Sequence, residues 1–288
     1  MSTCHAPHRP DLEELMAESE LPVLPPDTPY LLKAMASEEM SFRELAAVVE
    51  RFPSIAAKLI ALANSPWSSP VTEVTSVEMA CARLGFFVVR SVSVALSLAN
   101  VFNPAVCPAF DGVRYWTDAF ITADLCTTLS EQVTGAAELE PQAVRTAGLL
   151  HNLGLLWLAT WRPEETHTAL SKAAEEPTTP VDRLLERHCG IGFVEAGALL
   201  ADAWRFPPLL VVSVGCHASP DYQEIHWRSA AVVGLARHFV HRHRDPETPP
   251  DPRLDRLGLD TETQQSILER MDRRLDEVRE LAGTLFHL

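Results

Sequence analysis

The residues with the clearest chemical potential lie in "GLLHNLGL" at positions 148–155, where His151 and Asn152 stand side by side among leucines and glycines. A histidine followed by an aspartate in such a setting would indicate a metal site, because imidazole and carboxylate together hold divalent cations. Here the second residue is an amide, which is neutral and a weaker ligand. Against a ligand role stands a simpler interpretation, which we favour: His151 is a buried histidine that is hydrogen-bonded within a helical core.

Two other groups of potential ligands are weaker. Cys216 and His217 are adjacent, but a single Cys-His pair without further spaced ligands is a poor indication of zinc. In "HFVHRHRD" at 238–245, His238 and His241 share one side of a helix and His243 does not share a face with His241. A solvated helix end explains this cluster better than a metal site. The sequence contains no Walker loop, no GxGxxG motif after a strand and no nucleophile elbow.

The composition excludes several classes of protein. The 288 residues carry a net charge of −15, which argues against binding to nucleic acids or to anionic membrane surfaces. The six cysteines form no CxxC pair and are typical of reduced thiols. The first residues, "MSTCHAPHRPDLEEL", contain no apolar signal region, and the apolar stretch 88–102 is interrupted by polar residues, so we expect it not to span a bilayer. We therefore expect a cytoplasmic protein.

Almost every segment has the apolar periodicity of a helix, and the alternation typical of strands is missing. Two capping boxes, Ser41 with Glu44 and Thr75 with Glu78, predict helix starts. Gly85 predicts a stop between paired helices at 76–84 and 86–102, of which the second is apolar on most sides and should be central. Further helices are predicted at about 112–134, 141–160, 163–175, 180–189, 191–204, 207–217 and 226–243.

The C-terminal part is expected to differ from this core. Residues 244–260 are rich in proline and aspartate and predict a linker or an ordered wrap-around loop. Residues 261–288 predict one amphipathic helix that begins with a Thr261/Gln264 capping box and either docks on its own bundle or pairs with a second chain. Its apolar stripe comprises Leu268, Met271, Leu275, Val278, Ala282 and Leu285, and its solvated face Arg270, Arg273, Arg274, Glu277 and Glu280.

Five stretches, in order, carry a resemblance to a known family: "RFPSIAAKLIALANSPW", "SVEMACARLGFFVVRSVSVALSL", "YWTDAFITADLC", "AGLLHNLGLLWL" and "VEAGALLADAWRFPPLLVVSVGCHASP". From about residue 21 to 240, the chain resembles the HDOD family, bacterial proteins related to the HD-domain metal phosphohydrolases. The resemblance implies an all-α, multi-helix bundle, to which this chain adds its C-terminal helix. It divides the chain into an N-terminal extension (1–20), the HDOD-like domain (21–243), the linker (244–260) and the final helix (261–288).

The resemblance also places the residues of a vestigial HD site. Asp118 stands where the family helix often has a histidine after tryptophan, Asn152 replaces the aspartate, and Phe193 occupies the position of a frequent histidine. Among the equivalents that can be placed, only His151 and His217 remain. Because metal affinity depends on the number and charge of the ligands, these departures predict that the site has no catalytic residues and binds no metal or other cofactor.

The resemblance implies a role in bacterial signal transduction. We expect a non-catalytic regulatory protein that binds another signalling protein through the bundle surface and through Leu268, Met271, Leu275, Val278 and Leu285 of the C-terminal helix. Two alternatives remain open at this point: a metal-dependent HD-type phosphohydrolase with atypical ligands, for instance one that acts on cyclic dinucleotides, and a small-molecule sensor that uses the vestigial pocket.

Overall fold

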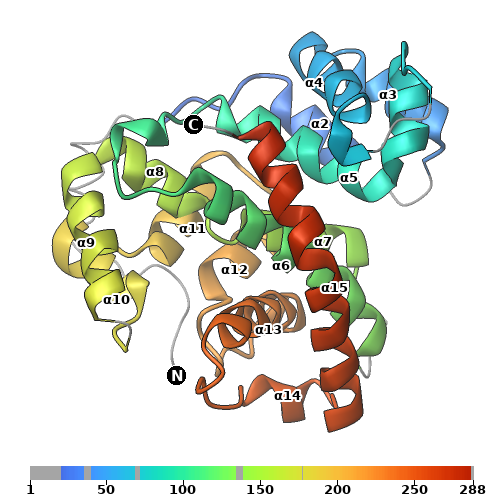
Figure 1. Ribbon diagram of the computed structural model, residues 1–288. Helices are drawn as coiled ribbons and strands as arrows, with labels where there is room; N and C mark the ends of the chain where they lie inside the picture. Colours follow the sequence, from blue (N-terminus) through green and yellow to red (C-terminus); the bar gives the residue numbers. More distant parts are fainter. Residues whose placement is uncertain (1–20, 36–39, 69–71, 134–138, 177, 287–288) are drawn as a thin grey trace.

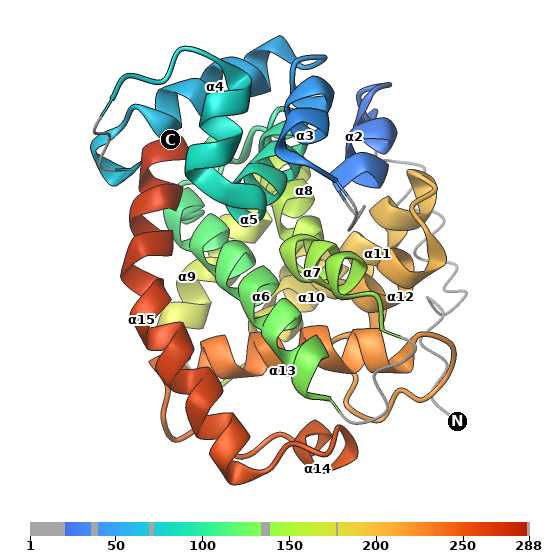
Figure 2. The same ribbon diagram turned by 90° about the vertical axis from the view of Figure 1, so that its right-hand side faces the viewer.

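The computed structural model describes residues 21–35, 40–68, 72–133, 139–176 and 178–286, and in these ranges it contains helices and no strand. The all-α prediction is confirmed. Helices α2 to α5 form one end of the molecule, and α13 and α14 form the other (Figures 1 and 2). The first group comprises α2 (Thr28–Met35), α3 (Phe42–Val49), α4 (Pro53–Ala63), the short η1 (Pro66–Ser68) and α5 (Val77–Ala99).

One of the two predicted N-terminal capping boxes is present. The Ser41 side chain accepts from the Glu44 amide at 3.3 Å, and the Glu44 carboxylate accepts from the Ser41 amide at 2.8 Å. The second box is wrong: Ser76, not Thr75, caps α5 by accepting from the Met79 amide at 3.2 Å. Two adjacent hydroxyl residues precede that helix, and the one whose backbone is extended (Ser76, ψ 157°) takes the capping position.

The predicted break at Gly85 is confirmed: the backbone leaves helical geometry there (φ 76°, ψ 164°), so the element labelled α5 consists of two helices joined across a kink. Gly85 has φ +76°, a backbone conformation that favours glycine, and the helix continues beyond it to Ala99. By length and composition alone α5 could cross a membrane, but 67% of its most apolar window is buried inside the protein, as in the core helix of a soluble protein. The prediction that it is central is wrong, because α5 packs mainly against α2, α3 and α4 at one end of the molecule.

The helices of the middle of the chain follow α5, and α7 and α13 pack against α6 rather than around α5. The predicted helix 141–160 is divided in two, because Asn152 has non-helical φ and ψ (−109°, 18°). The chain therefore changes direction directly after His151. The elements of this part are η2 (Pro104–Val106), α6 (Gly112–Gln132), α7 (Pro141–Leu150), α8 (Leu153–Trp161), α9 (Pro163–Glu175), α10 (Val181–Cys189), α11 (Phe193–Ala203), α12 (Pro208–Cys216) and α13 (Trp227–Arg244).

Residues 245–260 are ordered and contain the short helix α14 (Arg253–Arg256). Arg253 is 7% exposed, forms an ion pair with Asp251 at 2.6 Å, and donates to the carbonyl of His217 at the end of α12. Leu254, Leu257 and Leu259 are buried in the core. Of the two interpretations of this segment, the contacts favour an ordered wrap-around loop over a free linker.

The last helix, α15 (Thr261–Leu285), docks on its own bundle along α6 and spans the molecule from the α14 end to the α4 end (Figure 2). Its cap is Asp260, which accepts from the Thr263 amide at 2.8 Å, so the predicted Thr261/Gln264 box is wrong. Trp67 donates to the Glu277 carbonyl at 3.0 Å, and Phe286 stacks on Trp116 at 4.4 Å.

The predicted solvated face of α15 needs a correction. The Arg270 and Arg274 side chains reach back to the buried carboxylate of Asp124 on α6, at 3.7 and 3.4 Å. Asp124 is 6% exposed, and a buried carboxylate needs such partners. The predicted stripe packs in the core as expected, and Ile267 and Leu281 join it.

The cysteines largely match the expectation of reduced thiols. Cys81, Cys107, Cys126 and Cys189 are free and buried. Cys216 is disulfide-bonded, so the expectation is wrong for that residue.

Truncation after Pro252 should lower the melting temperature or change the oligomeric state. The deletion removes α14 and α15 and exposes the apolar side of α6 that α15 covers. Differential scanning calorimetry and sedimentation velocity measure the two effects. If neither quantity changed, α15 would contribute nothing to the stability of the bundle.

A single substitution tests the contact between the end of α15 and α6 without deleting the helix. Phe286→Ala should destabilise the protein by about 3 kcal/mol, because the buried ring that stacks on Trp116 is lost. Arg279→Ala is the control, since Arg279 is exposed on the outer side of α15 and should change the unfolding free energy by less than about 0.5 kcal/mol. Urea unfolding of both variants measures the difference.

Candidate functional site

Two buried histidines form the centre of the candidate site, and each stands at the end of a helix. His151 follows the last residue of α7, and its Nδ1 bonds to the carbonyl of Gly148 at 2.7 Å. His217 follows the last residue of α12, and its Nδ1 bonds to the carbonyl of Val214 at 2.8 Å. The rings meet edge to face with centroids 5.5 Å apart. The structure thus brings together two residues that are 66 positions apart in the chain.

These hydrogen bonds fix the protonation of both rings. A carbonyl can only accept, so each Nδ1 carries the proton and each Nε2 presents a lone pair. Burial, reinforced by the nearby Arg237 charge, lowers the pKa of His151 to about 3. Burial, the neighbouring His151 and Arg237 hold the pKa of His217 well below its usual range. Both imidazoles are therefore neutral at physiological pH.

The glycines of "GLLHNLGL" explain how the helices come close enough to form this pair. A Cβ on Gly148 would lie 2.6 Å from Cys126 Sγ of α6, so no larger residue allows α7 its position. A Cβ on Gly154 would collide with the carbonyl of Phe193 at the start of α11. The stretch is thus a close-packing motif on both sides of His151.

The other three vestigial positions do not supply ligands. Phe193 packs beside His217, with ring centroids 6.4 Å apart. Asp118 forms a forked ion pair with Arg244 of α13, with one N–O distance of 2.7 Å, so its carboxylate is already engaged. Asn152 is 7% exposed, and its Oδ1 has no hydrogen-bond partner in the described part of the chain.

An HD-type metal centre does not fit these residues. The available donors are the lone pairs of two imidazoles and one neutral amide oxygen, whereas Mg²⁺ and Ca²⁺ take carboxylate oxygens and a zinc site has at least three His, Cys or carboxylate ligands. Across the described ranges, no three His, Cys, Asp or Glu side chains are grouped so that they could hold a metal ion.

The sequence analysis did not identify two residues that lie at this site, Arg237 and Asp182. Arg237 of α13 places its guanidinium over the Phe193 ring, 5.5 Å from the centroid. Asp182 of α10 accepts from the Val194 amide at 3.2 Å, at the start of α11, and burial raises the pKa of its carboxyl. The signal for Arg237 was present in "AAVVGLARHF", where one arginine interrupts an apolar helical run.

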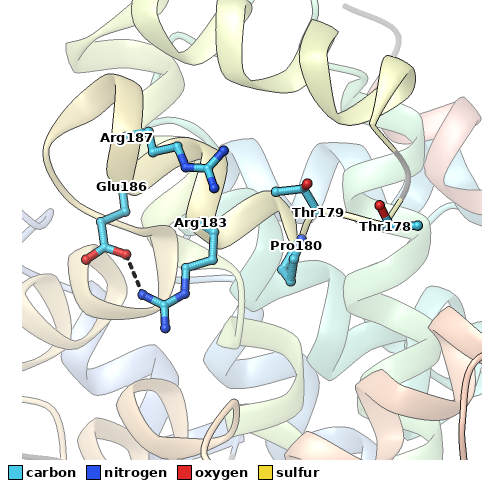
Figure 3. Close-up of a pocket in the computed structure, with 6 residues that line it drawn as sticks. All are labelled: Thr178, Thr179, Pro180, Arg183, Glu186 and Arg187. Atoms are coloured by element: carbon cyan, nitrogen blue, oxygen red, sulfur yellow. Dashed lines mark hydrogen bonds and ion pairs between the residues drawn. The ribbon is translucent and has the colours of Figure 1, made fainter.

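A separate hollow of about 580 Å³ lies on the surface where the chain passes from α9 to α10, and its lining comes from residues 178–180 and from α10 itself (Figure 3). Arg183 and Arg187 of α10 line it together with the hydroxyls of Thr178 and Thr179. Glu186 accepts from Arg183 at 2.9 Å, and Arg187 extends into the open space. The hollow is basic on a chain that is acidic overall, so it suits an acidic group of a partner.

His151→Ala should lower the unfolding free energy by about 1–3 kcal/mol, because the variant loses a buried hydrogen bond and leaves the Gly148 carbonyl unpaired. Thermal unfolding at pH 7.5 measures the loss. His188→Ala, on the half-buried side of α10, is the control and should have a smaller effect. A His151→Ala variant as stable as the wild type would show that the bond to Gly148 does not contribute.

The stability should also depend on pH in a defined window. Because the pKa of His151 is lower in the folded state than in the unfolded state, the unfolded chain binds more protons below pH 6.5. The contribution of His151 is complete above about pH 6.5 and declines as the pH falls towards 3, by up to about 1.4 kcal/mol per pH unit. Urea titrations of wild type and His151→Asn should give a flatter profile for the variant; equal slopes would contradict the neutral, buried state.

Comparisons with known proteins agree with this geometry. The HDOD domain model matches residues 21–220. A solved Marinobacter aquaeolei VT8 protein, provisionally described as a signal transduction protein, is 25% identical with a TM-score of 0.80; the match covers 95% of this chain and 61% of that one. An HDOD domain protein of unknown function from Geobacter sulfurreducens has 20% identity and a TM-score of 0.69, with 96% and 97% of the two chains covered.

A further solved structure, a Shewanella amazonensis SB2B protein provisionally described as a phosphohydrolase, is 22% identical with a TM-score of 0.68, covering 96% of this chain and 97% of its own. An uncharacterized Treponema pallidum protein is 21% identical over 233 residues, which are 80% of this chain and 44% of that protein. The chain thus spans less than two thirds of the Marinobacter and Treponema relatives. Because the family model covers most of the helical core, including both histidines, the chain belongs to the HDOD family.

Proposed function

We propose that this HDOD protein is a non-catalytic regulator in bacterial signal transduction and acts through contact with a protein partner in the cytoplasm. The observation that carries the proposal is the state of the vestigial site. His151 and His217 could each still offer an Nε2 lone pair, but Asp118 is held by Arg244, and Phe193 and Asn152 stand at the other two positions. A phosphohydrolase needs a fuller set of metal ligands, carboxylates among them, to bind metal and to activate water.

The surface that binds the partner should be one that a second protein can reach without unfolding part of this chain. The apolar stripe of α15 packs against α6 in the same chain, so a partner would have to displace the helix to use it. The basic hollow where the chain passes from α9 to α10 needs no such rearrangement. We therefore propose that an acidic segment of a signalling partner binds at Arg183 and Arg187. A homodimer formed through the same surface is a second outcome of the binding experiment.

The absence of catalysis can be tested directly. The purified wild-type protein, supplied in turn with Mn²⁺, Fe²⁺ and Zn²⁺, should hydrolyse neither cyclic dinucleotides nor nucleotides nor p-nitrophenyl phosphate above the buffer rate. Asn152→Asp alone should not create activity, because Phe193 and the engaged Asp118 still leave the ligand set incomplete. Turnover in the wild type that disappears in His151→Ala would contradict the proposal.

The partner contact needs its own experiment. Arg183→Glu/Arg187→Glu should reduce capture of the partner from a native lysate by at least about tenfold, since two favourable charges become repulsive. Arg43→Glu, at an exposed position of α3, is the surface control on another helix. Undiminished capture by the double variant would exclude the hollow as the binding surface.

A further inference from the structure

Arg237 stands in an unusual position for an arginine. It lies on α13 between the buried Ala236 and the half-buried His238, and it is only partly exposed itself. Its guanidinium rests on the Phe193 ring, and Phe193 in turn packs beside His217. Over the described ranges, its remaining attraction is to Asp182 and Asp118, beyond ion-pair distance. Since an arginine keeps its charge at neutral pH, the site contains a fixed cation of its own.

The charge of Arg237 reaches both imidazoles. Its guanidinium lies 5.5 Å from the Phe193 ring centroid, that ring lies 6.4 Å from the His217 ring, and His217 meets His151 at 5.5 Å, so the charge lies one ring away from the histidine pair. The nearby carboxylates do not cancel it. Asp118 forms an ion pair with Arg244, and Asp182 accepts from the amide of Val194 at the start of α11.

We infer that Arg237 is the residue that excludes metal from this site. Its guanidinium supplies the positive charge at the histidine pair, and a divalent cation bound by the same imidazoles would face that charge across an apolar interior, where repulsion is weakly screened. The inference rests on the proposed non-catalytic function and goes beyond it. On this inference, restoring the missing ligands does not restore tight metal binding as long as Arg237 is present.

The experiment compares two ligand-restored proteins that differ only at position 237. Asn152→Asp/Phe193→His supplies the carboxylate and the third histidine, and the second protein adds Arg237→Gln. Isothermal titration calorimetry with MnCl₂ and with ZnCl₂ should give a dissociation constant at least about tenfold lower for the protein without Arg237. The control adds Arg242→Gln instead, which removes an equal charge elsewhere on α13, and should stay within about twofold of the first protein.

Equal metal affinity with and without Arg237, or an equal gain from Arg242→Gln, would overturn the inference. If the ligand-restored proteins do not fold, as judged by circular dichroism, the single variant Arg237→Gln is compared with the wild type for Zn²⁺ binding to the two native imidazoles. Tighter binding by the single variant supports the inference and unchanged binding overturns it. The metal-binding experiment and the turnover assay test different claims. Hydrolysis by the wild type would contradict the proposed function, whereas the ratio of the two metal dissociation constants tests only the role of Arg237.

Discussion

The interior of this bundle depends on one interaction that occurs twice: an imidazole N–H donates to the carbonyl three residues earlier, at the end of a helix. A helix terminus leaves carbonyls without partners, and burying them unpaired is costly. His151 and His217 solve this for α7 and α12 within an apolar interior. Because the rings must be neutral donors to do so, they can pack against each other without mutual repulsion, and the chain can turn at Asn152 in the centre of the protein.

The same arrangement decides what kind of chemistry the interior allows. Neutral imidazoles, a phenyl ring and a guanidinium form a sequence of contacts from His151 through His217 and Phe193 to Arg237. None of these groups attracts a cation strongly, and the two nearest carboxylates have other partners, since Asp118 pairs with Arg244 and Asp182 accepts from the Val194 amide. The fold of an HD-type protein is therefore retained while the electrostatic character of its centre is inverted. The glycines that bring the helices together serve packing regardless of whether the site is catalytic.

The sequence predicted the existence of the helices well where a single face was apolar. It predicted the residues at which the helices begin and end less well. Ser41 with Glu44 was identified correctly, whereas at α5 and α15 the neighbouring Ser76 and Asp260 cap the helix, since the choice between adjacent polar residues depends on backbone angles that composition does not encode. The break at Asn152 was missed for a similar reason. A helical pattern continues through it, and only tertiary contacts at Gly148 and Gly154 require the turn.

The candidate site was predictable in its identity and only partly in its surroundings. The family resemblance pointed to His151 and His217, and the structure brings these two rings together, whereas the loss of catalysis stays a prediction. The ion pair between Asp118 and Arg244 joins residues 126 positions apart, and no local pattern indicates it. Arg237 was visible as a charge in an apolar run, but whether such a charge points outward or into the core is decided by the packing of α13 against α6 and α12.

The course of α15 has a consequence for the order of folding. Its contacts connect residues that are very distant in sequence: the Trp67 indole meets the Glu277 carbonyl, 210 positions away, and Trp116 meets Phe286. Closing such long loops is entropically unfavourable until the intervening helices are already in place. The apolar side of α6 therefore stays open while the rest of the bundle assembles, and docking of α15 is the closing step. During that interval, the chain presents its largest unprotected apolar surface, and there self-association would compete with folding.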